Sequence, residues 1–137
     1  MQGLRRNIGF PVVAVVLLMF TAVMLPEVAA TRYIVGGNKG WTTNVNYSIW
    51  ARSKHFYKGD WLFFVSTNWK RTDVFEVRKK DYDKCNSNHP IHKLSKGYGR
   101  DVVPLNVTKT YYFISGRGFC YGGMKVAIQV KSRRPRV

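Results

Sequence analysis

A regular alternation of apolar and polar positions marks the segment near the end of the chain. Positions 124, 126, 128 and 130 are apolar and fall on one face of an extended backbone, whereas Lys125 and Gln129 fall on the other. The pattern predicts a β-strand over residues 124–130 with one buried face. Short runs of aromatic and β-branched residues, bounded by turn residues, predict further strands at 33–35, 61–65, 73–77, 101–105 and 110–114.

Two of these runs also indicate where their strands lie in a sheet. Residues 61–65 are apolar throughout, which predicts a strand buried on both faces. Residues 101–105 contain Pro104, which cannot donate to a strand ladder and therefore predicts an edge strand. Six or more short strands in about 100 residues indicate an all-β sandwich.

The predicted helices are short. Residues 46–51 are expected to form one helical turn with Tyr47 and Trp50 facing inward, and residues 78–83 a second short helix. Residues 66–72 and 86–99 are polar or rich in turn formers and are expected to be loops.

The first 30 residues have the composition of a secretory signal peptide. A basic start at Arg5 and Arg6 precedes an apolar run over residues 8–25, and small residues lead to expected cleavage after Ala30. A retained membrane anchor is the alternative interpretation of the apolar run. Residues 31–130 then form the folded domain.

Residues 131–137 are expected to be a basic, frayed tail. They lack the apolar stretch of a lipid-anchor signal. We therefore expect a secreted protein in the extracellular space (the apoplast) or held at the outer face of the plasma membrane.

Export changes the interpretation of the cysteines and of two short motifs. An even pair in an oxidising compartment predicts one disulfide between Cys85 and Cys120, and two free buried thiols are the alternative. Asn46 and Asn106 each begin an Asn-x-Ser/Thr motif and are expected to carry N-linked glycans.

The chain has 23 Lys and Arg against 7 Asp and Glu, which gives a formal net charge of +16. Such a charge attracts polyanions over long range. For an exported monomer we expect an acidic cell-wall or cell-surface polysaccharide or glycoprotein as partner, or an anionic membrane surface, and not nucleic acid. A basic surface without a dedicated partner is the alternative.

The sequence gives little support to catalysis. Ser115, His92 and Asp101 are the residue types of a hydrolytic triad, but no nucleophile elbow surrounds the serine. His89 and His92 have a spacing found in metal sites, yet two His in a polar loop are more often solvated, and the disulfide uses Cys85. We therefore expect no enzyme and no physiological metal at these histidines.

Several motifs occur in one order along the chain. They are Tyr-Ile-Val-Gly-Gly at 33–37, Phe-Tyr-Lys-Gly-Asp-Trp-Leu-Phe at 56–63, Val-Phe-Glu-Val at 74–77, Tyr-Tyr-Phe-Ile at 111–114 and Cys-Tyr-Gly-Gly-Met-Lys at 120–125. Together they resemble the plant phytocyanins, a branch of the cupredoxins, over residues 32–130. Residues 114–125 are most similar to the early nodulin-like, or lamin-like, subgroup. The resemblance implies a cupredoxin-like Greek-key β-sandwich with one or two short helices and one disulfide.

The resemblance also locates the positions that hold copper in the family. The thiolate position carries Ser115, the two imidazole positions carry Thr72 and Phe119, and only Met124 matches a possible axial ligand. A lone thioether does not hold copper, because thiolate and imidazole supply the affinity. We therefore expect no type I copper site and no other cofactor.

Without a metal, the loops at this end of the sandwich have two interpretations. Either Phe119 and Tyr121 fill the vacated space, or the loops form a binding mouth where aromatic rings stack on sugars and cations meet acidic groups. The mouth residues would be Trp69, Lys70, Arg71, Arg117, Phe119 and Tyr121.

The function expected from these features is that of a secreted, copper-free phytocyanin-like glycoprotein that binds or signals at the cell surface or cell wall. A blue-copper-type one-electron transfer protein is the alternative.

Overall fold

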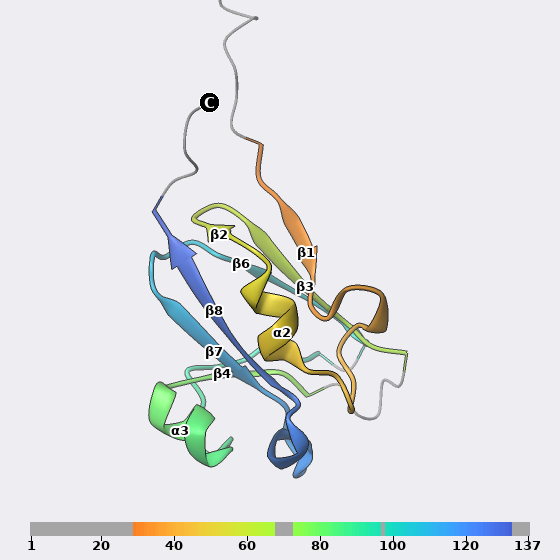
Figure 1. The fold of residues 1–137 in the computed structure, drawn as a ribbon. Coiled ribbons are helices and arrows are strands. Elements are labelled where there is room, and N and C mark those ends of the chain that lie inside the picture. The colour runs from red at the N-terminus through yellow and green to blue at the C-terminus, as the bar shows by residue number, and fades with distance from the viewer. Residues whose placement is uncertain (1–28, 68–72, 97, 133–137) are drawn as a thin grey trace, which may run out of the picture.

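The computed structural model of the chain describes residues 29–67, 73–96 and 98–132, which form two β-sheets with a shared core (Figure 1). One sheet has the spatial order β1 (Arg32–Ile34), β3 (Trp61–Val65), β6 (Arg100–Pro104). The other has the order β2 (Phe56–Tyr57), β8 (Lys125–Lys131), β7 (Thr110–Ile114), β4 (Phe75–Val77), β5 (His92–Lys93).

Short helices connect these strands. Within the described residues, α2 (Tyr47–Arg52) packs next to β8, and α3 (Lys79–Lys84) packs next to β7 (Figure 1). Two 3-10 turns are η1 (Gly37–Lys39) and η3 (Phe119–Gly122). The all-β sandwich with two short helices and one disulfide, Cys85–Cys120, confirms the fold predicted from the sequence.

Alternate side chains from both sheets form the core. The apolar positions 126, 128 and 130 of β8 are buried, together with Met124 just before the strand, as the alternation predicted. The ring of Phe64 on β3 lies 5.1 Å, between centroids, from the ring of Phe113 on β7. Aromatic packing therefore joins the two sheets.

The prediction that β3 is buried on both faces is wrong. Alternate residues of β3 are buried, whereas Trp61 on the opposite face is 37% exposed. The strand register places Ile34, Phe63 and Val102 in one row across the three-stranded sheet, and the two outer members of that row are exposed. The apolar run over residues 61–65 therefore arises because the outer face of this sheet is also apolar, although no second core covers it in the described residues.

The sequence also did not predict two short strand pairings. β5 lies within the expected loop 86–99, where Ile91 N–H donates to Glu76 O at 2.7 Å. β2 lies in a segment for which no strand was predicted and pairs in parallel with the end of β8. Lys131 therefore belongs to β8 and not to the tail. Two-residue strands leave no periodic pattern, because partners far along the chain stabilise them.

Other predictions agree closely with the structure. α2 and α3 each begin one residue later than predicted, and β6 is an edge strand. Residues 1–28 and 133–137, which hold most of the expected signal peptide and tail, lie outside the described residues. In the part of the chain that is described, no helix combines the length and apolarity needed to span a bilayer.

Asn46 and Tyr47 fix the start of α2. Asn46 Oδ1 accepts a hydrogen bond from Ile49 N–H at 3.1 Å, which caps the helix. The buried Tyr47 hydroxyl donates to Gly40 O at 2.8 Å and accepts from Thr42 N–H at 2.8 Å. Burial raises the pKa of Tyr47, and the hydrogen bond with Thr42 opposes that rise. These contacts join α2 to the turn that follows β1.

Asp60 joins the beginnings and ends of three strands. Its buried carboxylate accepts hydrogen bonds from Thr31 N–H at 2.9 Å and Tyr57 N–H at 3.0 Å. Its backbone oxygen accepts from Leu105 N–H at 2.9 Å. Thr31 precedes β1, Tyr57 ends β2 and Leu105 follows β6, so this single side chain and its backbone connect both sheets.

Asp60→Ala is expected to lower the free energy of unfolding by roughly 3 kcal/mol, because two N–H groups lose a charged acceptor in a buried site. Urea unfolding followed by tryptophan fluorescence measures the change. Asp83→Ala is the matched control, since that carboxylate is exposed and pairs with the exposed Lys79, and it should unfold close to wild type. Equal stability of the two variants would contradict the role of Asp60.

Candidate functional site

The segment between β7 and β8 is closed by backbone hydrogen bonds. Ser115 N–H donates to Met124 O at 3.0 Å, and Met124 N–H donates to Phe119 O at 3.2 Å. Phe119 N–H donates to Gly116 O at 3.3 Å. Three positions that the family resemblance assigns to copper ligands therefore lie next to one another at one end of the sandwich. The fourth, Thr72, lies outside the described residues.

The side chains at these three positions are buried or half-buried. Ser115 and Met124 are each 2% exposed, and Ser115 Oγ lies 3.5 Å from Gly116 O as a hydrogen-bond donor. Met124 belongs to the main core, and the half-buried Phe119 packs against it. Tyr121 is 77% exposed, so the expectation that it also fills this space is wrong: η3 turns it outward.

The donor chemistry of these positions does not fit type I copper. That site needs a thiolate and two imidazoles. The Ser115 side chain has a hydroxyl that hydrogen-bonds to a backbone oxygen. The Phe119 side chain has no donor atom for a metal, and its ring packs on the core. The Met124 thioether is a weak ligand that is already packed in the core. These three side chains therefore do not provide the ligands that a copper ion would need for electron transfer at this site.

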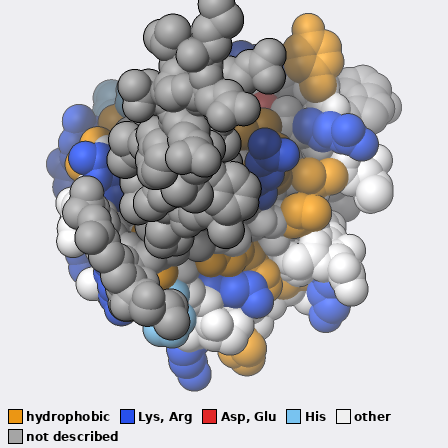
Figure 2. Space-filling view, turned by 90° about the horizontal axis from the view of Figure 1, so that it is seen from above, with side chains coloured by type: hydrophobic (Ala, Val, Ile, Leu, Met, Phe, Trp, Pro, Cys, Tyr) orange, Lys and Arg blue, Asp and Glu red, His pale blue; other side chains and the backbone are white. Residues whose placement is uncertain are grey.

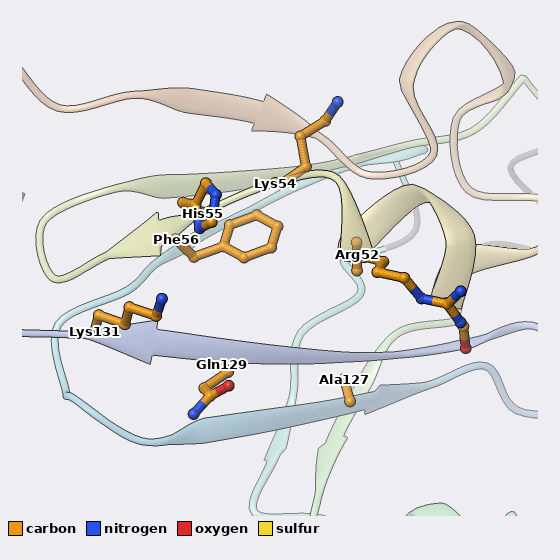
Figure 3. A pocket seen from close by; sticks show the side chains of 9 residues that line it. Arg52, Lys54, His55, Phe56, Ala127, Gln129 and Lys131 are labelled. Atoms are coloured by element: carbon orange, nitrogen blue, oxygen red, sulfur yellow. The ribbon is translucent and has the colours of Figure 1, made fainter.

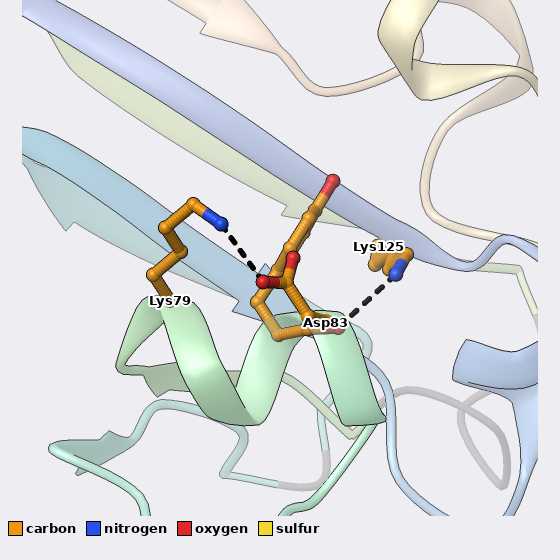
Figure 4. A network of polar contacts seen from close by, with 4 residues as sticks. Lys79, Asp83 and Lys125 are labelled. Atoms are coloured by element: carbon orange, nitrogen blue, oxygen red, sulfur yellow. Dashed lines mark hydrogen bonds and ion pairs between the residues drawn. The ribbon is translucent and has the colours of Figure 1, made fainter.

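The disulfide fixes the far side of the loop. Cys120, in η3, is bonded to Cys85 at the end of α3. Cys120 belongs to a small second core cluster, and Cys85 packs against that cluster. Lys125 Nζ donates to Tyr82 O at 3.1 Å and lies 4.4 Å from the centre of the Tyr82 ring (Figure 4). Burial raises the pKa of Tyr82. α3 and the start of β8 are therefore joined by covalent, hydrogen-bonding and cation–π contacts.

Asp73 and Arg117 close the loop from the other side. Arg117 Nε lies 3.4 Å from Asp73 Oδ2, and Trp41 Nε1 donates to Asp73 O at 3.3 Å. Asp73 directly follows Thr72 in the sequence, so the neighbour of the fourth ligand position also lies at this loop. Arg117 was expected to meet an acidic ligand, but an acidic residue of the chain already pairs with it.

The structure tests the predicted binding mouth only in part. Trp69, Lys70 and Arg71 lie outside the described residues. Phe119 packs on the core, whereas Arg117 and Tyr121 are exposed. In the described part of this end of the sandwich, Phe119 therefore fills the space between the loops, as in the first of the two interpretations.

The candidate catalytic and metal residues do not assemble. Ser115 is buried, His92 is exposed on β5, and Asp101 lies in the other sheet, where its carboxylate accepts from Lys96 N–H at 3.1 Å. Burial raises the pKa of Asp101, against the lowering effect of that hydrogen bond. Among the described residues, no group of three or more His, Cys, Asp or Glu is placed to hold a metal ion.

A second candidate site, which the sequence did not indicate, is a groove between α2 and the end of β8 (Figure 3). We call it the cationic groove; it has a volume of about 420 Å³ and is lined by Ser48, Ala51, Arg52, Lys54, His55, Phe56, Ala127, Gln129 and Lys131. The parallel pairing of β2 with β8 brings its two halves together. Because no sequence pattern predicts that pairing, no local signal identifies the groove.

The two predicted glycosylation sites are on the surface. Asn46 and Asn106 are both exposed. Asn46 uses its Oδ1 atom as the helix cap, which leaves the amide nitrogen, the atom that carries an N-linked glycan, outside that hydrogen bond. Glycan attachment at either residue remains a prediction.

Comparison with known proteins gives consistent matches over most of the chain. The profile of the plastocyanin-like domain matches residues 41–124. Early nodulin-like protein 17 of Arabidopsis thaliana is 48% identical over 124 residues, which cover 90% of this chain and 72% of that protein. Early nodulin-like protein 19 of the same plant is 49% identical over 119 residues, covering 87% and 84% respectively.

Solved structures of similar fold include two cucumber proteins. Cucumber basic protein, a blue copper protein, aligns with a TM-score of 0.63 at 33% identity and covers 74% of this chain and 100% of its own. Cucumber stellacyanin aligns with a TM-score of 0.65 at 29% identity and covers 78% and 100%. The sandwich described above is thus the cupredoxin-like fold.

Gly116→Ala is expected to destabilise the protein by about 1–3 kcal/mol, because overpacking strains a tight site. A Cβ atom at this position would lie 2.9 Å from Phe75 Cε2 and 3.3 Å from Asp73 Oδ2. Gly122→Ala in the same loop is the control, since its Cβ would meet nothing within 4 Å. Denaturant unfolding compares the two variants, and equal midpoints would show that the loop is not closed as described.

Proposed function

The chain belongs to the plastocyanin-like phytocyanin family, in its early nodulin-like subgroup, and from this premise we propose that it is a copper-free binding protein of the plant cell surface. Its partner is an acidic polysaccharide or glycoprotein of the cell wall or cell surface. The protein is secreted as a monomer, carries glycans at Asn46 and Asn106, and acts through its basic, aromatic-rich surface without catalysis.

The closed loop between β7 and β8 is the observation that supports a function without copper. Ser115, Phe119 and Met124 meet there through consecutive backbone hydrogen bonds, and none of the three supplies a strong copper ligand. Electron transfer, the alternative function, draws only on the resemblance in fold to proteins such as the blue copper protein of cucumber.

The charge distribution supports an anionic partner. Cations outnumber acids by 23 to 7. Three of the carboxylates of the described residues already pair with cations of the chain. Asp73 pairs with Arg117, Glu76 with Lys109, and Asp83 with Lys79. Of the described side chains visible from the end shown in Figure 2, many are Lys or Arg and few are acidic. This uncompensated positive charge attracts polyanions in a salt-sensitive way.

Exposed aromatic residues favour a saccharide over a simple polyanion. Tyr98, Tyr121 and Trp61 all expose their rings, and aromatic faces stack on the apolar faces of sugars. Export, expected from the first 30 residues, places cell-wall polysaccharide within reach and nucleic acid out of reach.

Adding Cu(II) to the oxidised, metal-free protein is expected to give no intense visible absorption and no blue-copper electron paramagnetic resonance signal. The physical reason is the absence of a thiolate ligand, because the two cysteines form the disulfide. Cucumber basic protein treated in the same way is the positive control. A copper–thiolate charge-transfer band in this protein would contradict a copper-free function.

The full-length secreted protein is expected to bind immobilised polygalacturonate at low ionic strength and to elute as salt rises, because screening weakens the attraction. The same matrix after methyl esterification has lost its negative charge and should retain little protein. Absence of retention on polygalacturonate at low salt, or retention that salt leaves unchanged, would count against the polyanion partner.

A further inference from the structure

The cationic groove has a composition distinct from that of the closed loop. Arg52, Lys54 and Lys131 line it together with His55, and none of the described lining residues is acidic. Its volume of about 420 Å³ falls in the range of sites that bind small molecules or single units of a polymer.

Rigid elements position the basic groups of the groove. Arg52 ends α2, and Lys131 ends β8, where Lys58 N–H donates to Lys131 O at 2.8 Å. His55 O accepts a hydrogen bond from the Tyr33 hydroxyl at 2.9 Å, which holds the segment between α2 and β2 against β1. The backbones of these residues are therefore ordered before an anion binds, and binding orders only their side chains.

Within the described part of the chain, no carboxylate forms an ion pair with a cation of the groove. The ion pairs of the described residues are Lys79–Asp83, Lys109–Glu76 and Arg117–Asp73, and none includes a residue of the groove. A bound anion would therefore meet cations that no described carboxylate already neutralises.

The remaining lining residues suit a sugar ring. Figure 3 shows Arg52 towards one end of the groove and Lys131 towards the other. Phe56 lies between them but is 3% exposed, so it belongs to the core and offers little surface to a ligand. Ala51 and Ala127 add small apolar surfaces. Ser48 and Gln129 add a hydroxyl and an amide, which hydrogen-bond to sugar hydroxyls. A guanidinium group binds a carboxylate through two parallel hydrogen bonds.

We propose that the cationic groove binds a short uronate-containing stretch of an acidic polysaccharide. The Arg52 guanidinium binds one uronate carboxylate, and Lys131 Nζ binds the next charged unit along the chain. Ser48 and Gln129 hydrogen-bond to ring hydroxyls, and the apolar lining contacts the ring. This site rests on the proposed function, because it names where on the basic surface the acidic polysaccharide is recognised.

The test is isothermal titration of the full-length, oxidised protein with a short oligogalacturonate at low ionic strength. We compare wild type with Arg52→Gln/Lys131→Gln and with a control that loses the same charge elsewhere, Lys93→Gln/Arg100→Gln. The control residues are exposed on β5 and β6, outside the groove. The groove variant is expected to bind about tenfold more weakly or worse, because two charged contacts are lost. The control should stay near wild type.

Circular dichroism and the unfolding midpoint establish that both double variants are folded. Two further probes test the chemistry of recognition: the methyl-esterified oligomer, which keeps the sugar and loses the charge, and inorganic phosphate, which keeps the charge and lacks the sugar. Both are expected to bind the wild type much more weakly than the oligogalacturonate.

The outcomes separate the groove from the general polyanion function. Equal weakening in the two double variants would overturn the groove and leave a diffuse polyanion-binding surface. Phosphate binding as tight as oligogalacturonate binding, with loss in the groove variant, would overturn saccharide recognition. No binding of oligogalacturonate by the wild type would overturn both the groove and the proposed partner.

Discussion

The hydrogen bonds of the Ser115 and Met124 amides hold the end of the sandwich closed without a metal. They join the end of β7, the turn η3 and the start of β8 into one unit. The Cys85–Cys120 disulfide then ties this unit to α3. Backbone pairing and a covalent bond make this connection in the present chain, and the side chains of Met124 and Phe119, at two of the ligand positions, pack in or against the core.

Because the loop before β8 is closed, the two ends of β8 differ in chemistry. At its start, Met124 and Phe119 pack with the core and leave no ligand set. At its end, Lys131 reaches the surface beside α2 and β2, where cations gather without described counter-ions (Figures 1 and 3). The cupredoxin-like fold is thus retained, while the cationic groove lies on the side of the sandwich. Fold alone does not determine function, so the proposal of a binding role rests on these side chains and not on the fold.

The sequence predicted the parts of the fold that have strong local signals. The alternation over residues 124–130, the helical turn at α2 and Pro104 on an edge strand all specify their structure within a few residues. The two-sided burial of β3 was wrong, because hydrophobicity alone does not distinguish a core from an apolar outer face. β2, β5 and the cationic groove depend on pairing between distant segments, which leaves no local pattern. The resemblance located Ser115 and Phe119, but only the structure showed that they meet Met124.

The central claim is that the loop between β7 and β8 is closed by the chain itself. Amide hydrogen exchange of the oxidised, metal-free protein tests this most directly, because protection reports the free energy needed to open each hydrogen bond. The Ser115 and Met124 amides should exchange as slowly as core amides of β7, and added Cu(II) should not change their rates. Fast exchange of both amides that becomes slow only when copper is added would contradict the account.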